Sequence, residues 1–348
     1  MAQEKALVAM SGGVDSSVAA HLAMKEGLDV VGGTMLLWDT DPSFLQDAKS
    51  VCNTLGIPFQ SFDRSGAFRR QVVEPFISAY EEGLTPNPCM VCNRHIKFDV
   101  LLQDALELGC QWVVTGHYAR IRRDDQTGRY LLYKAADEAK DQSYFLAYLS
   151  QHQLAHTRFP LGELTKEEVR AIAQAQGFIN AKKRDSQDIC FVPDGDYVSF
   201  MKEYTGKTYP AGDYLDLEGH VVGRHCGAVC YTLGQRKGLN LAMGKPVYVC
   251  DKNMEQHTVT VGPNEALFSS VLTANDCNWF PFPALTQPMR LTAKARSRHN
   301  GAPATVYPLE DGGIRVEFDE PQRAITPGQA VVLYDGDMVI GCGTILHP

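Results

Sequence analysis

The chain has 348 residues, of which 44% are hydrophobic and 21% are charged. This composition is that of a globular protein of two or three domains and excludes disordered, collagen-like and coiled-coil classes. No run approaches the roughly 20 apolar residues of a membrane span, and the apolar stretch at 6–10 is too short for the core of a signal peptide. We therefore expect a cytoplasmic protein with no membrane partner. The net charge is −8, so binding of nucleic acid would require local basic patches.

The first 205 residues alternate short apolar runs with segments of helical periodicity. Strands separated by helices pair in parallel through right-handed crossovers, so this part predicts an α/β domain on a parallel sheet. The expected strands are 5–10, 29–36, 57–62 and 111–115. The expected helices are 16–25, 44–55, 68–82 with a kink at Pro75, 98–108, and 164–176 with a capping box at its start. Residues 83–93 are expected to form a loop, and 118–121 with 130–133 a hairpin.

From about residue 206 onward, glycine, proline and β-forming residues dominate. Segments 247–250 and 258–261 flank a turn, and the last eighty residues predict short strands in a small antiparallel barrel. We therefore expect an ATP-binding α/β domain at 1–205, a small linking domain at 206–266 and a C-terminal β-barrel at 267–348.

The segment SGGVDSS at 11–17 lies between the first expected strand and helix. Glycines let the backbone approach an anion, and the N–H groups at a helix start stabilise it. Asp15 would repel a bare phosphate, which favours a role with Mg²⁺. The loop has no lysine and so differs from G-x-x-x-x-G-K-[ST]. Its SGGxDS form resembles the pyrophosphate loop of ATP-pyrophosphatases, which cleave ATP to AMP and pyrophosphate. The alternative is an ordinary glycine-rich βα turn.

Three of the ten cysteines lie in segments that can carry chemistry. Cys89 and Cys92 form a CxxC pair in a proline-rich stretch, and Cys190 follows basic residues 182–184, which would favour its thiolate. An iron–sulfur cluster on these three thiols is one alternative. A zinc site completed by Cys226 and Cys230 is another. The remaining candidates for a structural role are Cys52, Cys110, Cys250 and Cys342.

Six motifs, in order and spacing, together resemble the tRNA-specific 2-thiouridylase family over essentially the whole chain. They lie at 11–17, 85–93, 115–118, 140–145, 185–191 and 232–239. The resemblance implies a tRNA-uridine 2-sulfurtransferase that uses ATP to replace oxygen by sulfur at C2 of the wobble uridine, position 34, in tRNAs for Lys, Glu and Gln. It also implies adenylation of the C2 oxygen, sulfur transfer from a cysteine persulfide, and a sulfur-donor protein that relays persulfide from a cysteine desulfurase.

The resemblance further implies which residues act. Cys92 matches the family's nucleophile and Cys190 the residue that holds the persulfide. Attack of one on the other would leave a Cys92–Cys190 disulfide that a reductant resets. The implied ATP-binding residues are Ala9, Met10, Ser11, Gly12, Gly13, Val14, Asp15, Ser16, Met35 and Gly116. The implied contacts with the target base or tRNA are Asn87, Pro88, Cys89, Lys140, Asp141, Gln142, Arg296 and Ser297.

This chain departs from the family pattern at two positions. The family often has aspartate where this chain has Cys89, so a carboxylate role does not carry over, and the extra thiol favours a three-cysteine cluster that could use free sulfide. The family commonly has an Arg-Tyr pair where this chain has Arg296 and Ser297, so stacking by that tyrosine is lost.

A row of cations near the C-terminus is the predicted tRNA surface. Arg290, Lys294, Arg296 and Arg298 occupy alternate positions, and on a strand they would share one face and contact phosphates. Residues 182–184 and 236–237 extend the row, and a solvated edge strand is the alternative. Two rival functions stay open: a different ATP-pyrophosphatase that ligates nitrogen, and an RNA-binding module with a vestigial loop.

Overall fold

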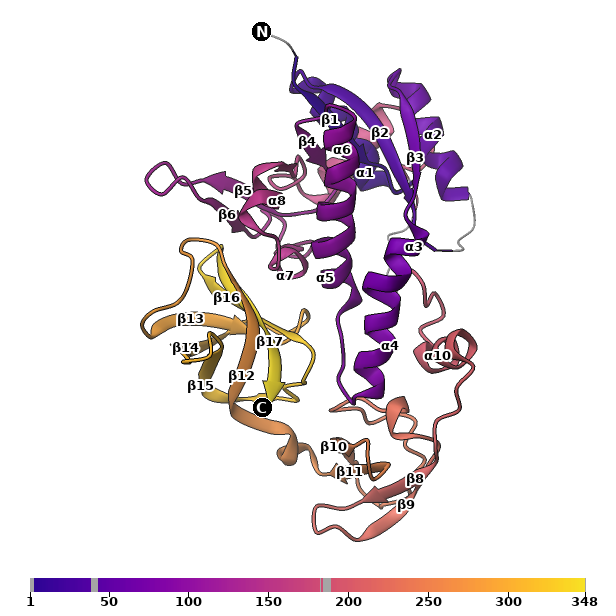
Figure 1. Ribbon diagram of the computed structural model, residues 1–348, viewed down its shortest axis with the longest axis vertical. Coiled ribbons are helices and arrows are strands. Elements are labelled where there is room, and N and C mark those ends of the chain that lie inside the picture. The colour runs from indigo at the N-terminus through magenta and orange to yellow at the C-terminus, as the bar shows by residue number, and fades with distance from the viewer. Residues whose placement is uncertain (1–2, 39–42, 182, 184–188, 348) are drawn as a thin grey trace.

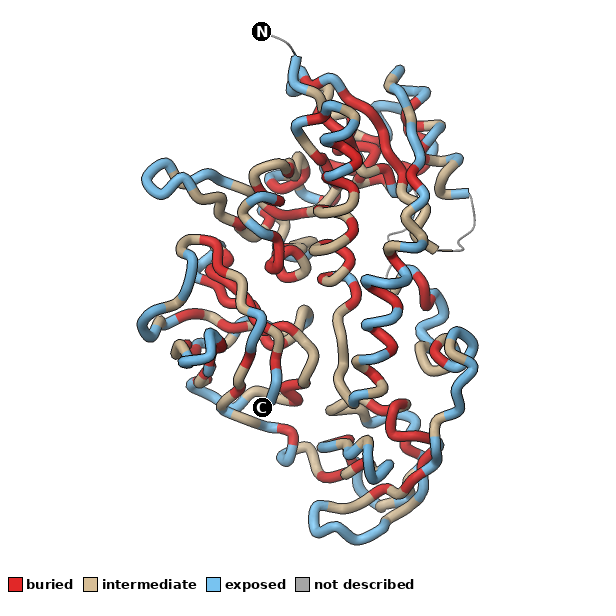
Figure 2. Tube along the Cα trace, viewed as in Figure 1, coloured by how far each residue is buried: buried red, intermediate tan, exposed pale blue. Residues whose placement is uncertain are grey.

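The computed structural model describes residues 3–38, 43–181, 183 and 189–347. Figure 1 shows three parts: an α/β domain that holds the N-terminus, a small sheet at the opposite end, and a barrel that holds the C-terminus. Figure 2 shows that buried residues run through the centre of the α/β domain and the barrel, while exposed residues follow the loops. No helix in the described part of the chain is both long and apolar enough to cross a membrane.

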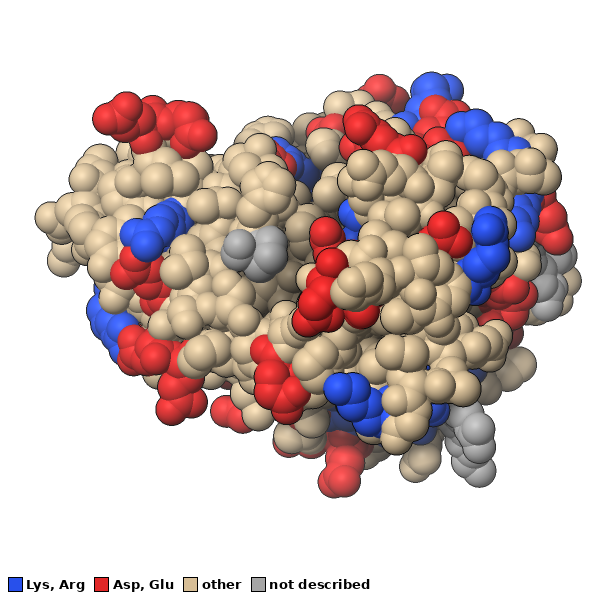
Figure 3. Space-filling view, turned by 90° about the horizontal axis from the view of Figure 1, so that it is seen from below, with Lys and Arg blue, Asp and Glu red and all other residues tan. Residues whose placement is uncertain are grey.

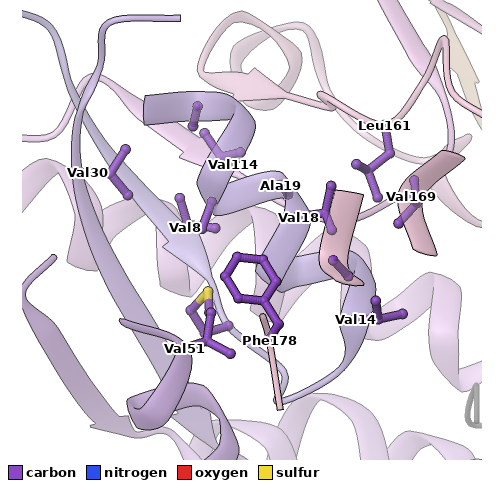
Figure 4. Packing of buried hydrophobic residues seen from close by; sticks show 14 of the residues in the cluster. Val8, Val14, Val18, Ala19, Val30, Val51, Val114, Leu161, Val169 and Phe178 are labelled. Atoms are coloured by element: carbon purple, nitrogen blue, oxygen red, sulfur yellow. The ribbon is translucent and has the colours of Figure 1, made fainter. Parts of the chain in front are cut away.

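The α/β domain is built on a five-stranded parallel sheet with the order β3-β2-β1-β4-β7. The strands are β1 (Lys5–Ala9), β2 (Asp29–Leu36), β3 (Phe59–Asp63), β4 (Trp112–Val114) and β7 (Thr157–Arg158). Three helices cover one face: α1 (Val14–Lys25), α2 (Ser43–Leu55) and α9 (Lys166–Ala175). Figure 4 shows side chains of this face, with Val8 and Val30 of the strands packed against Val18 and Val51 of the helices. The predicted parallel sheet is confirmed, as is the capping box of α9.

Two long helical columns run from this sheet toward the other end of the molecule (Figure 1). The first consists of α3 (Ser65–Phe68), η1 (Arg69–Val73) and α4 (Glu74–Glu81); the second of α5 (Pro88–Cys92), η2 (Asn93–Val100) and α6 (Leu101–Glu107). Each column contains a π-helical turn, η1 and η2. In the first, η1 ends two residues before Pro75, which has no N–H to donate.

The loop predicted at 83–93 is wrong from Pro88 onward. The helix expected to begin at residue 98 begins at Pro88, with Asn87 in an extended conformation before it. Proline suits the first position of a helix because its φ is already helical and its missing N–H would have had no partner there. The cysteine pair therefore lies on a helix.

Several short elements connect the α/β domain to the barrel. The predicted hairpin is confirmed as β5 (Arg120–Arg123) and β6 (Tyr130–Tyr133), and β6 pairs with the last strand of the barrel. Two helices of this part were not predicted, α7 (Ser143–Leu146) and α8 (Gln151–Ala155). Helix α10 (Tyr197–Thr205), which precedes the small sheet in the chain, was not predicted either.

The small sheet at the far end has the order β10-β11-β8-β9. Its strands are β8 (Gly212–Leu215), β9 (Val221–His225), β10 (Tyr248–Asn253) and β11 (Thr258–Gly262), with the short helix η3 (Ala228–Cys230) beside them.

The C-terminal part, which follows η4 (Asn264–Leu267), is an antiparallel barrel closed by the pairing of β12 with β17, as predicted. Its strands are β12 (Phe268–Trp279), β13 (Met289–Lys294), β14 (Ala302–Pro308), β15 (Ile314–Arg323), β16 (Ala330–Asp335) and β17 (Met338–His347).

Candidate active site

A cavity of about 770 Å³ opens at the carboxyl ends of β1, β2 and β4. Ligands of open α/β sheets bind at this edge. The cavity is lined by seven of the ten predicted ATP-binding residues, namely Ala9, Met10, Ser11, Asp15, Ser16, Met35 and Gly116. It is also lined by Gln142 and Cys190, which were predicted for other roles. The structure thus brings the glycine-rich loop and one candidate sulfur-bearing cysteine to one cavity.

The loop before α1 is held in shape by its own hydrogen bonds. The Ser16 hydroxyl donates to the Gly13 carbonyl at 3.0 Å and accepts the Ser11 N–H at 3.2 Å. Asn180 donates to the Gly12 carbonyl at 3.1 Å. Gly12 has φ +72°, and a Cβ there would lie 2.5 Å from the Phe44 carbonyl oxygen, so only glycine fits. The loop is therefore preformed, with the positive end of the α1 dipole beside the cavity.

Asp15, which was predicted to act with Mg²⁺, already has two partners. The Lys166 ammonium donates to its two carboxylate oxygens at 2.7 and 2.8 Å, and the Tyr118 hydroxyl donates at 2.9 Å. The Lys166 side chain is only 10% exposed, so its end of the ion pair is shielded from water, whereas Asp15 is 30% exposed. Asp15 is therefore not a free magnesium ligand in this structure.

The segment that follows β4 forms the wall next to the loop. Gly116 lies so close to the loop that a Cβ would be 2.6 Å from the carbonyl carbon of Asp15 and 2.7 Å from the nitrogen of Ser16. His117 lines the cavity and hydrogen bonds to the Thr115 hydroxyl through Nδ1 at 2.7 Å. Burial lowers the pKa of His117 well below its ordinary value, and the positive charge of Lys97 adds to this effect. The imidazole is thus neutral at neutral pH.

The three candidate cysteines lie near one another. Cys92 is buried in α5, and burial raises its pKa to about 12, with smaller contributions from the charges of Cys190 and Cys89. Cys89 and Cys190 are exposed residues, yet partial burial raises the pKa of each thiol as well. Because Cys92 responds to the charges of Cys190 and Cys89, and Cys190 responds to the charge of Cys89, the structure places the predicted trio in one region.

The described residues contain no group of three or more His, Cys, Asp or Glu arranged to hold a metal ion. The cysteine trio therefore does not form a ready set of iron ligands in this conformation. Cys226 and Cys230 lie around η3, where the Cys226 thiol contacts the Tyr231 hydroxyl at 3.7 Å. The zinc interpretation, which needs Cys226 and Cys230 beside Cys89 and Cys92, has no ligand set in the part of the chain that is described.

Of the residues predicted to contact tRNA at 87–88 and 140–142, only Gln142 lines the cavity. Gln142 lines the cavity, and its side chain accepts the Tyr118 N–H at 3.0 Å. Asp141 instead shapes its own turn, because its carboxylate accepts the N–H groups of Ala135 and Ser143. Lys140 is half-buried beside it, and Asn87 and Pro88 begin α5.

The predicted row of cations on one strand is wrong in its second half. Strand β13 ends at Lys294, and the chain then turns, so Arg296 and Arg298 do not continue its face. Arg290 is paired with Asp319. Arg296 is half-buried and donates to the Leu233 carbonyl at 3.1 Å and to the Thr326 hydroxyl, so it ties the barrel to the segment after η3. The neighbouring Ser297 is also half-buried.

The predicted extensions of that row differ from each other. Lys183 pairs with Asp47 at 2.8 Å, whereas Lys182, Arg184 and residues 185–188 lie outside the described residues. Arg236 and Lys237 are exposed. Figure 3 shows acidic and basic side chains interspersed on the face seen from below, among the residues that are drawn in colour.

Sequence reasoning missed Lys97, which lines the cavity. It lies five residues after Cys92, a spacing that on an ordinary α-helix indicates a different face. The π-helical turn η2 brings the two residues closer to one face. No residue pattern in the sequence indicated such a turn.

Three family models match the chain. One described as a tRNA methyl transferase HUP domain matches residues 4–194, one described as a tRNA methyl transferase PRC-barrel domain matches 198–263, and one described as an aminomethyltransferase beta-barrel domain matches 269–345.

Curated relatives match over nearly the full length. A protein of Symbiobacterium thermophilum named tRNA-specific 2-thiouridylase MnmA is 49% identical over 358 residues, covering 98% of this chain and 92% of the relative. A protein of the same name from Clostridioides difficile is 45% identical, covering 98% of both chains. Among solved structures, NMN synthetase from Francisella tularensis gives a TM-score of 0.36 at 18% identity, covering 60% of this chain and 79% of that one. A 4-thiouridine synthetase–RNA complex with bound ATP gives 0.37 at 16% identity, covering 58% and 50%.

Proposed function

Because the chain belongs to the tRNA-specific 2-thiouridylase family, we propose that it replaces the C2 oxygen of uridine 34 in tRNA with sulfur at the expense of ATP. The observation that supports this most directly is the single cavity lined by both the SGGVDSS loop and Cys190. A nucleotide held by the loop would lie beside the sulfur-bearing cysteine, which makes the reaction between bound groups local.

The first half of the reaction is adenylation. The C2 carbonyl of uracil is a poor electrophile, and its oxygen is a poor leaving group. The loop binds the phosphates of ATP through backbone N–H groups and the Ser11 hydroxyl, while Ser16 holds the loop in shape. The C2 oxygen bonds to the α-phosphorus while the bond from phosphorus to pyrophosphate breaks, and the uracil N3 proton is released. Neutral His117 and Gln142 line the cavity and would contact the base or the nucleotide.

The second half is sulfur transfer. The terminal sulfur of a persulfide on Cys190 bonds to C2 while the C2–O bond breaks and AMP departs with the oxygen. The Cys92 thiolate then attacks the Cys190 sulfur, which releases the thiolated base and leaves a Cys92–Cys190 disulfide. An external dithiol must reduce this disulfide before the next turnover. Cys89 begins the same helical turn as Cys92 and takes no part in these steps.

The family resemblance also suggests a set of substrates and a partner. We propose that tRNAs for Lys, Glu and Gln are the substrates and that a persulfide-carrying protein, charged by a cysteine desulfurase, supplies the sulfur. The target uridine must leave its stack to reach the cavity. The remainder of the tRNA would rest across the barrel, where Arg298 is exposed and Arg296 and Ser297 lie beside it.

The test is thiolation of unmodified tRNA in a purified system. The protein is incubated with ATP, magnesium, a cysteine desulfurase and cysteine, and 2-thiouridine is measured by mass spectrometry of digested tRNA. We expect thiolation by the native chain, loss by at least about a thousand-fold in Cys92→Ser and Cys190→Ser, and retention in Cys89→Ser. Cys277→Ser, in the barrel, is the matched control.

A nitrogen-ligating ATP-pyrophosphatase would give the opposite pattern. It would release pyrophosphate equally well in Cys92→Ser and Cys190→Ser, and it would form no 2-thiouridine. Thiolation that requires Cys89, together with stoichiometric bound iron after anaerobic purification, would replace the persulfide route by one that uses a cluster and free sulfide.

A further inference from the structure

The cavity contains little positive charge among its described lining residues. Lys97 is the only lysine or arginine among the described residues that line it. The Asp15 carboxylate is neutralised by Lys166 and the His117 imidazole is uncharged. Lys97 itself has no hydrogen bond or ion pair with the residues that the structure describes. A half-buried ammonium without a protein partner in a cavity for a polyanion is available to that anion.

The helix that carries Lys97 decides where this charge lies. In η2 the Leu101 N–H donates to the Ile96 carbonyl, an i→i+5 bond. A π turn of this kind brings residues five apart closer to one face than an α-helix does, and such turns recur at functional sites. Lys97 follows Cys92 by five residues. Its charge lowers the pKa of Cys92, Cys190 and Cys89 against the larger effect of burial, which shows that the ammonium lies near all three thiols.

The phosphate-binding loop gives the reason for a cation at this place. The SGGVDSS loop has no lysine, so its own contribution is limited to hydroxyls, N–H groups and the dipole of α1. These groups suit the pyrophosphate end of ATP. The α-phosphate must lie between the loop and the cysteines, because it bonds to the base that the sulfur attacks. Lys97 lines the same cavity and lies near the three cysteines.

We propose that Lys97 is a catalytic residue whose ammonium binds the α-phosphate of ATP and stays on it through both halves of the reaction. This rests on the proposed function. In adenylation, negative charge grows on the α-phosphate oxygens as the C2 oxygen bonds to the α-phosphorus, and the electron pair of the broken bond leaves with pyrophosphate. In sulfur transfer, the C2–O bond breaks and its electron pair leaves on the phosphate oxygen of AMP. Lys97 stabilises the charge in each case and exchanges no proton. A cation placed where charge develops lowers both barriers.

The experiment compares Lys97→Met, which keeps the length of the side chain and removes its charge, with Lys97→Arg, which keeps the charge. Lys25→Met, exposed at the end of α1, is the matched control. Two rates are measured on full-length protein: tRNA-dependent pyrophosphate release without a sulfur donor, which reports adenylation, and 2-thiouridine formation with the donor. The melting temperature of each variant is recorded, so that a folding defect is recognised.

We expect Lys97→Met to lower kcat of both reactions by about a hundred-fold or more, to change KM for ATP by less than about five-fold, and to melt like the native chain. Lys97→Arg should recover at least a tenth of the native rate. Native adenylation by Lys97→Met with loss of thiolation alone would overturn the proposal, because Lys97 would then serve the thiols. Equal rates in Lys97→Met and the native chain would also overturn it. If the native chain itself made no 2-thiouridine, the proposed function would fail instead.

Discussion

Lys97 in the cavity and Arg296 at the barrel are both half-buried cations, but among the residues that the structure describes only Arg296 has acceptors, at Leu233 and Thr326. Arg290 in the barrel is likewise paired, with Asp319. The barrel cations were prominent in the sequence because of their alternation, whereas Lys97 was inconspicuous. The availability of a charge for a ligand therefore depends on the acceptors that the fold places around it, which spacing along the chain does not reveal.

We expect the largest difference in stability and ATP binding between substitutions at two glycines, Gly116 in the cavity and Gly312 in the barrel. Gly116→Ala places a methyl group against the backbone of Asp15 and Ser16, so we expect about 1–3 kcal/mol of lost stability and a loss of ATP binding by at least ten-fold. Gly312→Ala, in a barrel turn at φ +83° with open space around it, costs only local strain. Calorimetric ATP titration and denaturant unfolding measure both. Equal ATP affinities in the two variants would contradict the claim that the close contact of Gly116 with the loop is needed for ATP binding.

The second prediction contrasts two carboxylates. Asp15→Asn leaves the Lys166 ammonium, whose side chain is only 10% exposed, without its counter-charge. We expect about 2 kcal/mol of lost unfolding free energy. Asp319→Asn removes the partner of Arg290, but both side chains are about half exposed, so we expect no measurable change. Urea unfolding of the two variants decides this, and the reverse order would show that the cavity ion pair is not structural.

The third prediction concerns the barrel arginines. Arg296→Met leaves the Leu233 carbonyl and the Thr326 hydroxyl without their donor, so we expect a loss of about 1–3 kcal/mol in stability with little change in the salt dependence of tRNA binding. Arg298→Met, at an exposed position, should keep stability and reduce the salt slope by about one. A reduced slope in Arg296→Met at native stability would instead make Arg296 a phosphate contact.

The smallest effect is a difference in thiol reactivity with pH. Burial raises the pKa of both Cys190 and Cys342, the latter well above its ordinary value in the barrel core. Thiolate is the reactive form, so alkylation of Cys190 by iodoacetamide should be slow at neutral pH and rise through pH 9 without levelling off. Cys342 should stay unmodified over the same range. Peptide mapping measures both, and a plateau for Cys190 below pH 8 would contradict the assigned direction.

The raised pKa values of these two thiols also affect folding stability. Their pKa values are higher in the folded chain than in the unfolded chain, so the unfolded chain loses its thiol protons first as pH rises. Stability should therefore fall as pH rises above the ordinary thiol pKa of about 8.5.

Much of the fold was accessible from the sequence because it depends on local patterns. Alternating apolar runs and helical periods predicted the parallel sheet, and the SGGVDSS segment predicted the loop that precedes α1. The start of α5 at Pro88 was missed because a proline pair usually indicates a loop. The role of Arg296 was missed because its partners lie 63 and 30 residues away. Such contacts come from tertiary packing, which residue spacing does not contain.

The most direct test of the account follows the oxygen that leaves the base. The tRNA carries ¹⁸O at C2 of uridine 34, and the products of one turnover are analysed by mass spectrometry. The account predicts that the label appears in the phosphate of AMP, because the C2 oxygen bonds to the α-phosphorus before sulfur displaces it. Label in inorganic phosphate would contradict it by showing activation at the γ-phosphorus, and label in water would show that sulfur enters without adenylation.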